Sequence, residues 1–185
     1  MRNVLAITAC LKRCSIAISY ENNVYKINEN VDASANLAYL TSKLIKSHNV
    51  DLKKIGGIIT ASGPGSFTGI RVAQSLAKGM ALSLKIPSAS VDYFDVIDNI
   101  LSKKQLNRIV LIKSEKDQVY FKFIKSDNTP NEIGVSSYEN LNLKDDLIVI
   151  DDMGLDFRKA KYLLNFSNLI TETSCITPLY INARS

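Results

Sequence analysis

Hydrophobic and polar residues alternate with a strand-like period near the start of the chain. Val4–Thr8 is a short apolar run of the kind that forms a buried strand. Residues 14–20 alternate from Cys14 to Tyr20, and residues 24–28 alternate again after the polar turn at 21–23. These three segments predict an antiparallel meander.

A helical period follows the meander. Asp32 or Ser34 can cap a helix that runs to about Ser47, because both side chains accept hydrogen bonds from backbone amides at a helix start. His48, the sole histidine, comes next, and we expect its imidazole to meet the last carbonyls of that helix. The apolar stripe of this helix consists of Leu37, Leu40, Leu44 and Ile45.

A second strand-and-helix pair occupies residues 55–84. Ile55–Ala61 predicts a buried strand, and Gly69–Leu84 predicts a helix whose wide apolar stripe indicates burial on more than one side. Its alanines and Gly79 would let another helix approach closely. Periodicity alone leaves two interpretations open: packing inside its own domain, or packing against a partner. The stripe comprises Ile70, Ala73, Ala77, Met80, Ala81 and Leu84.

The rest of the chain predicts one more helix of the first lobe and then a smaller α/β lobe. A helix is expected at 92–102, strands at 109–113, 119–124 and 147–150, a short helix at 158–165 and an extended tail at 178–181. A chain of 185 residues can form two small lobes. We therefore predict two domains, at residues 1-104 and 105-185.

Composition and charge narrow the class of protein only slightly. The net charge of +5 comes from lysines spread along the chain, and their short clusters are typical of solvated faces. The first residues are too quickly interrupted for a signal peptide, and no apolar run approaches the ~20 residues of a membrane span. We expect a cytoplasmic, soluble protein. The three cysteines lack the spacing of zinc or redox sites.

The glycine-rich segment Ser62–Arg71 is the strongest chemical signal. It lies between a strand and a helix, where backbone amides favour anions. It has no Lys-Ser/Thr pair of a Walker loop, no three-glycine dinucleotide spacing and no nucleophile-elbow pattern. A tight turn, an anion or nucleotide contact and a partner contact remain open. The candidate anion or nucleotide contacts are Gly63, Gly65, Ser66, Thr68, Gly69 and Arg71.

The segment Ala61–Arg71, together with Ala77–Ala81, closely resembles the TsaB (YeaZ) family, which is related to the glycoprotease-like TsaD proteins. Val4–Ile7, Cys14–Ile18 and the tail 178–184 extend the resemblance. It implies an α/β, actin-like (ASKHA, ribonuclease H-like) fold with a complete N-terminal lobe and a reduced C-terminal lobe.

The resemblance also implies a function. Family members are non-catalytic subunits that support TsaD in threonylcarbamoyl transfer to the adenosine next to the anticodon in tRNA. The implied partners are TsaD and TsaE, with a homodimer when the chain is alone, tRNA contacted only through the complex, and no membrane. No cofactor is expected on this chain, and ATP is a candidate ligand of the complex. The implied partner interface comprises Leu37, Leu40, Leu44, Ile70, Ala73, Ala77, Met80 and Ala81.

Several residues depart from the patterns of related proteins. Thr8 stands where actin-like ATPases carry an aspartate, Ala33 where relatives often carry histidine, and Lys113 where they tend to show aspartate. Asp151 and Asp152 are few ligands for a cation and more often form a solvated turn. We predict no catalytic residues, no metal and no protease activity. Two alternatives remain: an independent nucleotide-binding phosphotransferase, and a homodimeric binding module.

Overall fold

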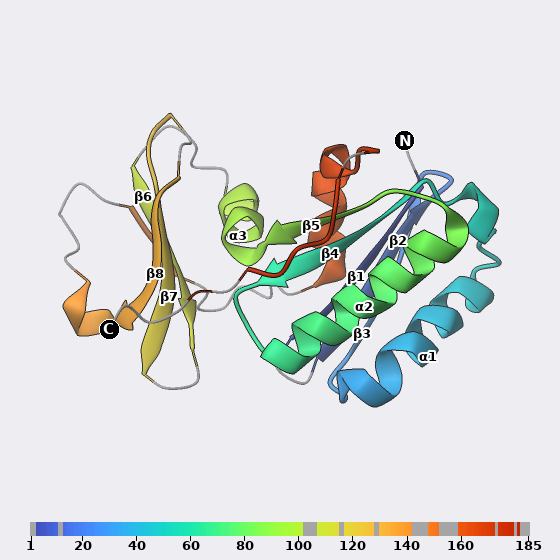
Figure 1. Cartoon of the computed structure of the whole chain (residues 1–185), viewed down its shortest axis with the longest axis horizontal. Helices are drawn as coiled ribbons and strands as arrows, with labels where there is room; N and C mark the ends of the chain where they lie inside the picture. The colour runs from blue at the N-terminus through green and yellow to red at the C-terminus, as the bar shows by residue number, and fades with distance from the viewer. Residues whose placement is uncertain are drawn as a thin grey trace. The chain divides into compact units, whose positions relative to one another are not determined.

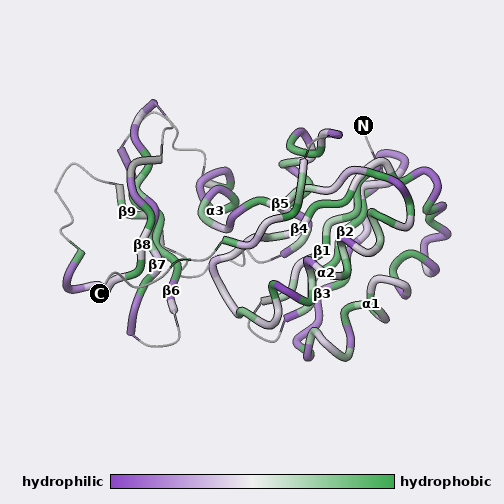
Figure 2. The backbone as a smooth tube through the Cα atoms, viewed as in Figure 1, coloured by the Kyte–Doolittle hydropathy of each residue, from purple (hydrophilic) through white to green (hydrophobic). Residues whose placement is uncertain are grey.

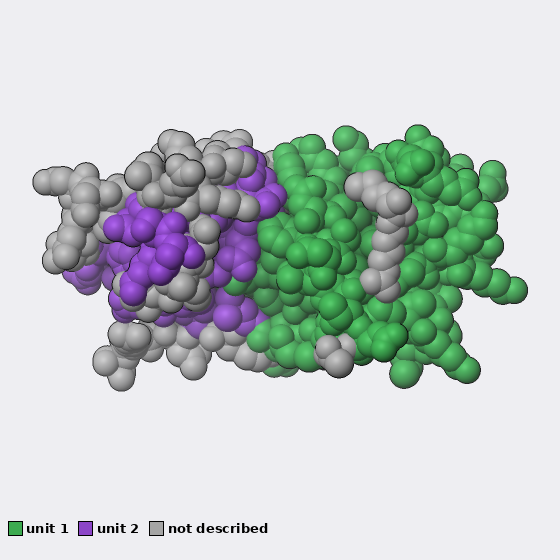
Figure 3. All heavy atoms as spheres, turned by 90° about the horizontal axis from the view of Figure 1, so that it is seen from above, with its two compact units in different colours: residues 1–92, 158–178 green, residues 93–157, 179–185 purple. Residues whose placement is uncertain are grey.

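The computed structural model describes residues 3–10, 13–101, 107–114, 117–127, 130–141, 148–151, 159–172, 174–179 and 181. They divide into two compact units, residues 1–92 with 158–178, and residues 93–157 with 179–185 (Figure 3). This division differs from the predicted ranges 1-104 and 105-185 in two places. The helix after residue 92 groups with the second unit, and residues 158–178 return to the first.

Unit 1 contains a five-stranded sheet with the order β3-β2-β1-β4-β5. The antiparallel meander of β1, β2 and β3 is confirmed, and β4 and β5 continue the sheet in parallel with β1. Parallel strands need crossover connections, and here two helices supply them. The strands are β1 (Val4–Cys10), β2 (Arg13–Tyr20), β3 (Asn23–Glu29), β4 (Gly57–Gly63) and β5 (Ser88–Asp92).

Two helices cover one face of this sheet side by side (Figure 1). α1 (Ala33–Ser47) is capped by Asp32, whose side chain accepts from the Ala35 amide. α2 (Phe67–Leu84) crosses β1 and β4, while α1 contacts β2 and β3. The short 3₁₀ helix η1 (Leu52–Lys54) joins α1 to β4. Along α1 and α2, hydrophobic and hydrophilic stretches alternate, as expected for helices with one buried face (Figure 2).

A segment from far along the chain covers the other face of the sheet. The 3₁₀ segment η3 (Ala160–Leu169) contacts all five strands. The Ala160 amide donates to Ser15 Oγ at 2.7 Å, which fixes the start of η3 to β2. At its other end, a Cβ added to Gly57 would lie 2.6 Å from Ile170 Cγ2, so side chain and strand backbone touch directly. The helix predicted at 158–165 is therefore a 3₁₀ segment that completes unit 1.

Unit 2 has a four-stranded sheet with the order β8-β7-β6-β9. β6, β7 and β8 form an antiparallel meander, and β9 pairs in parallel with β6, as β4 does with β1. In the described residues between β8 and β9 there is only η2 (Tyr138–Asn140), where unit 1 has α1. This is the reduced second lobe. Its elements are α3 (Tyr93–Leu101), β6 (Arg108–Lys113), β7 (Gln118–Ile124), β8 (Pro130–Ser137) and β9 (Ile148–Asp151).

Two ion pairs, one of them buried and the other partly exposed, connect α3 to the sheet of unit 2. The Arg108 side chain is fully buried and pairs through two nitrogens with both carboxylate oxygens of Asp98, with Nη2 and Oδ2 2.7 Å apart. This pairing raises the pKa of Arg108 above its usual range. Lys122 pairs with Asp95, whose side chain is 45% exposed. Among the described residues, no helix combines the length and apolar character that would let it cross a bilayer.

We predict that Asp98→Asn lowers the free energy of unfolding by about 3 kcal/mol, because it leaves a buried guanidinium without its counter-charge. The control Asp95→Asn should cost about 1 kcal/mol or less, since water reaches that carboxylate. Urea unfolding followed by circular dichroism measures both. If both variants lost the same free energy of unfolding, the larger contribution assigned to the Arg108–Asp98 pair would be wrong.

Candidate functional site

The glycine-rich segment forms the turn between β4 and α2. β4 ends at Gly63, whose φ of 117° lies in the left-handed region that side chains disfavour. The Gly63–Pro64 peptide bond is cis. Ser66 caps α2, and its Oγ accepts from the Gly69 amide at 3.4 Å. The segment is therefore a tight turn with a capped helix start, one of the three interpretations that the sequence left open.

The predicted anion contacts are distributed around this turn. Gly63 and Gly69 are buried, while Thr68 and Arg71 are exposed. The guanidinium of Arg71 lies 3.7 Å from the ring centroid of Phe67, whose side chain is 57% exposed. Gly65 and Ser66, the other two predicted contact residues, are half-buried. The structure thus brings these residues to one end of α2, and their contact with an anion or nucleotide stays a prediction.

The predicted partner interface needs a correction. Of its eight residues, seven are at most 7% exposed, because the two helices use them to pack on their own sheet. Met80 alone among the eight is half-buried. Side chains inside the core cannot contact a partner while unit 1 stays folded. The buried residues are Leu37, Leu40, Leu44, Ile70, Ala73, Ala77 and Ala81.

The outward side of the same two helices carries a different set of residues. On α2, Leu82 is 82% exposed, and a Cβ added to Gly79 would meet nothing within 4 Å. On α1, Tyr39 is 64% exposed. The sequence pattern does not single out this set, because the apolar stripe of α2 is wide. Leu82, an apolar residue outside that stripe, is the one sign in the sequence of an exposed apolar surface. We call this surface the helix face; it comprises Ala38, Tyr39, Lys43, Lys46, Arg71, Ser75, Lys78, Gly79 and Leu82.

Cys14, His48 and Thr8 have side chains that could take part in catalysis. Burial, and to a lesser extent Asp32, raise the pKa of the Cys14 thiol, which disfavours the reactive thiolate. The His48 ring stacks on Tyr25 with ring centroids 4.0 Å apart, and its backbone amide, rather than the predicted imidazole, meets the Lys46 carbonyl. Thr8 is buried within β1.

Asp151 and Asp152 are the adjacent carboxylates that the sequence predicts to form a solvated turn rather than a metal site. Across the residues that the structure describes, no group of three His, Cys, Asp or Glu side chains is placed to hold a metal ion. Asp152 and the side chain of Asp151 lie outside the described residues. The predicted lack of a metal therefore stays a prediction.

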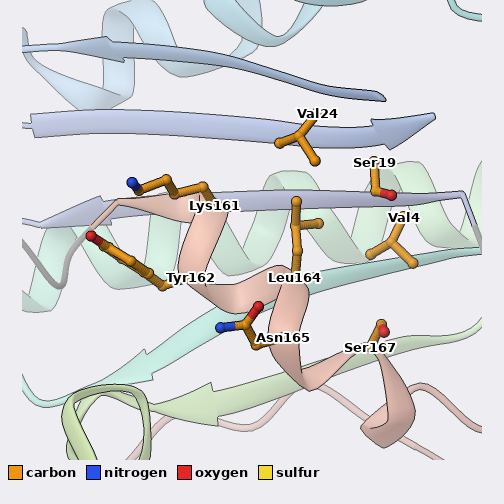
Figure 4. Close-up of a pocket in the computed structure, with 8 residues that line it drawn as sticks. All are labelled: Val4, Ser19, Val24, Lys161, Tyr162, Leu164, Asn165 and Ser167. Atoms are coloured by element: carbon orange, nitrogen blue, oxygen red, sulfur yellow. The ribbon is translucent and has the colours of Figure 1, made fainter. Parts of the chain in front are cut away.

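A pocket of about 460 Å³ opens on the other face of the sheet from α1 and α2, between η3 and the meander (Figure 4). Its lining is mainly apolar and includes one charged side chain, that of Lys161, whose Nζ lies 4.6 Å from the Tyr162 ring centroid. None of the predicted site residues contributes to it. The lining residues are Val4, Ser19, Val24, Lys161, Tyr162, Leu164, Asn165 and Ser167.

Comparison with solved structures supports the fold. A solved structure of YeaZ from Pseudomonas aeruginosa superposes with a TM-score of 0.77 at 19% sequence identity, covering 98% of this chain and all of that one. A second Pseudomonas aeruginosa structure, of a protein with similarity to peptidase YeaZ, gives a TM-score of 0.79 at 19% identity, covering 98% of this chain and 100% of that one. The chain is therefore a mixed α/β protein with the fold of YeaZ.

Comparison with sequences identifies the family. The model of the family described as TsaD, tRNA N6-adenosine threonylcarbamoyltransferase, matches residues 31–126, which is over half of the chain. A protein of Buchnera aphidicola from Acyrthosiphon pisum, named tRNA threonylcarbamoyladenosine biosynthesis protein TsaB, is 28% identical over 149 residues. A Haemophilus influenzae protein with the same name is 22% identical over 135 residues. The chain belongs to the family that this model describes, and the curated relatives that it resembles within it are named TsaB.

These alignments cover only part of each relative. They span 78% of this chain and 66% of the Buchnera protein, and 71% of this chain and 57% of the Haemophilus protein. The chain thus matches no more than 66% of the length of these curated relatives.

We predict that Ala77→Glu unfolds unit 1 or lowers its free energy of unfolding by more than about 3 kcal/mol, because Ala77 is fully buried and the new charge has no partner. Ser75→Glu, on the exposed side of the same helix, should change stability by about 0.5 kcal/mol or less. Thermal unfolding of the isolated chain distinguishes them. If Ala77→Glu melted like the wild type, the inward placement of this residue would be wrong.

Proposed function

We propose that this chain is a non-catalytic subunit that supports a TsaD-type protein in transferring threonylcarbamoyl to the adenosine next to the anticodon of tRNA. The names of the TsaB relatives support this role, since they place those proteins in threonylcarbamoyladenosine biosynthesis. The family model of TsaD itself matches residues 31–126, which include α1 and α2. Such a role would place the chain in the cytoplasm.

The exposure of Leu82 and the missing side chain at Gly79 indicate which surface the partner would contact. Leu82 is 82% exposed in the last turn of α2, one turn beyond Gly79, whose missing side chain leaves open space. A glycine inside a helix costs about 1 kcal/mol relative to alanine, and nothing within unit 1 contacts the space that its side chain would fill. Both features fit a surface against which another helix packs closely. We propose that the TsaD-type partner packs there.

In the proposed function, the TsaD-type partner catalyses the transfer and this chain does not. In this chain, Thr8 occupies the position where actin-like ATPases carry a carboxylate, and the Cys14 thiol is buried. Both observations support a non-catalytic role. ATP then belongs to the complex with the TsaD-type protein and a TsaE-type ATPase, rather than to this chain alone. tRNA is reached through the complex.

We predict that Leu82→Asp and Gly79→Leu weaken binding to the TsaD-type protein of the same organism at least tenfold, because one charges and the other overfills the proposed contact. Leu169→Asp is the control; Leu169 is a 41% exposed residue of η3, away from the helix face. Calorimetric titration gives the affinities. Unchanged binding by both variants, with folding intact, would show that the partner binds elsewhere.

Gly79→Ala separates stability from binding at the same position. The isolated chain should gain about 0.5–1 kcal/mol of stability, since alanine favours a helix and its methyl group meets no other atom. Affinity for the TsaD-type protein should fall at the same time, because the methyl group occupies space that the partner needs. A gain in stability with unaltered affinity would contradict the close contact at Gly79.

We also predict that the isolated chain does not hydrolyse ATP. The test is phosphate release by the purified chain, with Gly65→Asp as the control that disrupts the glycine-rich turn. Turnover by the wild type that disappears in Gly65→Asp would contradict the non-catalytic role and favour a phosphotransferase.

A further inference from the structure

The pocket between η3 and the meander has a floor made by one row of side chains across three strands. Val4 on β1 lies opposite Ser19 on β2, and Ser19 lies opposite Val24 on β3. Residues that are opposite one another in neighbouring strands point to the same face of a sheet. All three line the pocket, with the small side chain of Ser19 in the centre of the row. The hollow therefore follows from the strand register and from the small residue in the middle.

The wall of the pocket is the part of η3 that contains its kink. Phe166 has non-helical backbone angles inside this 3₁₀ segment, with φ −104° and ψ 20°. Asn165 and Ser167, on either side of the kink, both line the pocket. Leu164 projects from η3 toward the strands (Figure 4), while Val24 at the rim remains 53% exposed. η3 thus bounds the hollow without filling it.

One end of the pocket is polar and positively charged. Figure 4 shows Lys161 and the Tyr162 hydroxyl at one end of the view, and Val4, Ser19 and Ser167 at the other. The Lys161 ammonium lies 4.6 Å from the ring centroid of Tyr162. The described residues that line the pocket include no aspartate or glutamate. An anionic group at the Lys161 end would therefore be attracted by the ammonium and can accept hydrogen bonds from it and from the phenol.

We propose that this pocket binds a small aliphatic carboxylate. The carboxylate lies at Lys161 and Tyr162, and the hydrocarbon chain runs past Leu164 toward Val4 and Val24. The volume of about 460 Å³ is within the range of small-molecule pockets and corresponds to about fifteen water-sized groups. The pocket opens on the face of the sheet opposite to α1 and α2, so the proposal does not depend on the proposed function.

The lining argues against other classes of ligand. Phosphate esters such as nucleotides carry more negative charge and are usually held by several cations or by a helix N-terminus, whereas Lys161 is the one cation among the described lining residues. A cationic ligand would meet this ammonium with no carboxylate in that lining to balance it. A carboxylate on an aliphatic chain matches both the single positive charge and the aliphatic side chains of Val4, Val24 and Leu164.

The test compares octanoate with octanol, which has the same chain length and no charge. Each probe is titrated into the full chain carrying isotope-labelled valine and leucine methyl groups. The NMR shifts of the Val24 and Leu164 methyl groups report binding at the pocket, and those of the exposed Leu82 report non-specific adsorption. We expect octanoate to bind with a Kd on the order of 1 mM, as is usual for a ligand of this size. Octanol should bind about fivefold more weakly, because it lacks the charge.

Two substitutions separate the contribution of the charge from that of the apolar lining. Lys161→Met keeps an apolar stem without the ammonium, so it should weaken octanoate about fivefold and leave octanol unchanged, whereas Lys161→Arg should retain octanoate. Val24→Asp, at the exposed rim, should weaken both probes. Lys43→Met is the matched control, since it makes the same charge change on α1, which covers the opposite face of the sheet. It should alter neither affinity.

Three results would overturn the proposal. If octanoate at about 20 mM left the Val24 and Leu164 methyl groups unshifted, the pocket would not be a site for this class of ligand. If the Leu82 methyl groups shifted as much as those of the pocket, octanoate would be adsorbing to exposed apolar side chains in general. If octanol bound as tightly as octanoate, and Lys161→Met changed neither, the role assigned to the carboxylate would be wrong.

Discussion

The central sheet of unit 1 must be covered on both faces, and the rest of the structure depends on that requirement. Strands β1 and β4 run between neighbours on either side, and their side chains are buried on both faces. α1 and α2 cover one face. The other is covered by η3, which follows the strands of unit 2 in sequence and returns to pack on the small residues of the meander. Unit 1 is thus completed only by the later part of the chain. Two hydrogen bonds also hold the later segment to β5. The Ser90 hydroxyl donates to the Thr177 carbonyl and accepts from the Thr177 amide, both at 3.1 Å.

The same requirement decides which side of α2 is available to a partner. Ala73, Ala77 and Ala81 face the sheet, where small side chains let the helix lie close to β1 and β4. The sequence shows that these alanines favour close packing, yet periodicity does not reveal whether the neighbour is the same chain or another. Once they are used internally, the surface left for a partner is the opposite side, with Gly79 and Leu82. The family resemblance implies a partner on this pair of helices, and burial of the alanines leaves the outward side of α2 as the surface that a partner can reach.

Local patterns could be predicted where local physics determines them. The meander follows from alternation, and the Asp32 cap follows from its side-chain oxygens. β8 was missed because its strand pattern is interrupted by Gly134, which contacts the Phe121 ring from β7 so closely that a Cβ would lie 2.6 Å from it. The role of η3 was missed for a related reason. Tertiary contacts, such as those of Ser15 with Ala160 and of Gly57 with Ile170, show that this segment belongs to unit 1.

The helix face combines two features that give the isolated chain no benefit. Gly79 weakens α2, because a glycine inside a helix costs about 1 kcal/mol relative to alanine, and Leu82 exposes an aliphatic side chain to water. Inside unit 1 the same two helices bury their apolar side chains efficiently on the sheet. Both features become favourable together if the helix of a partner packs closely against that face.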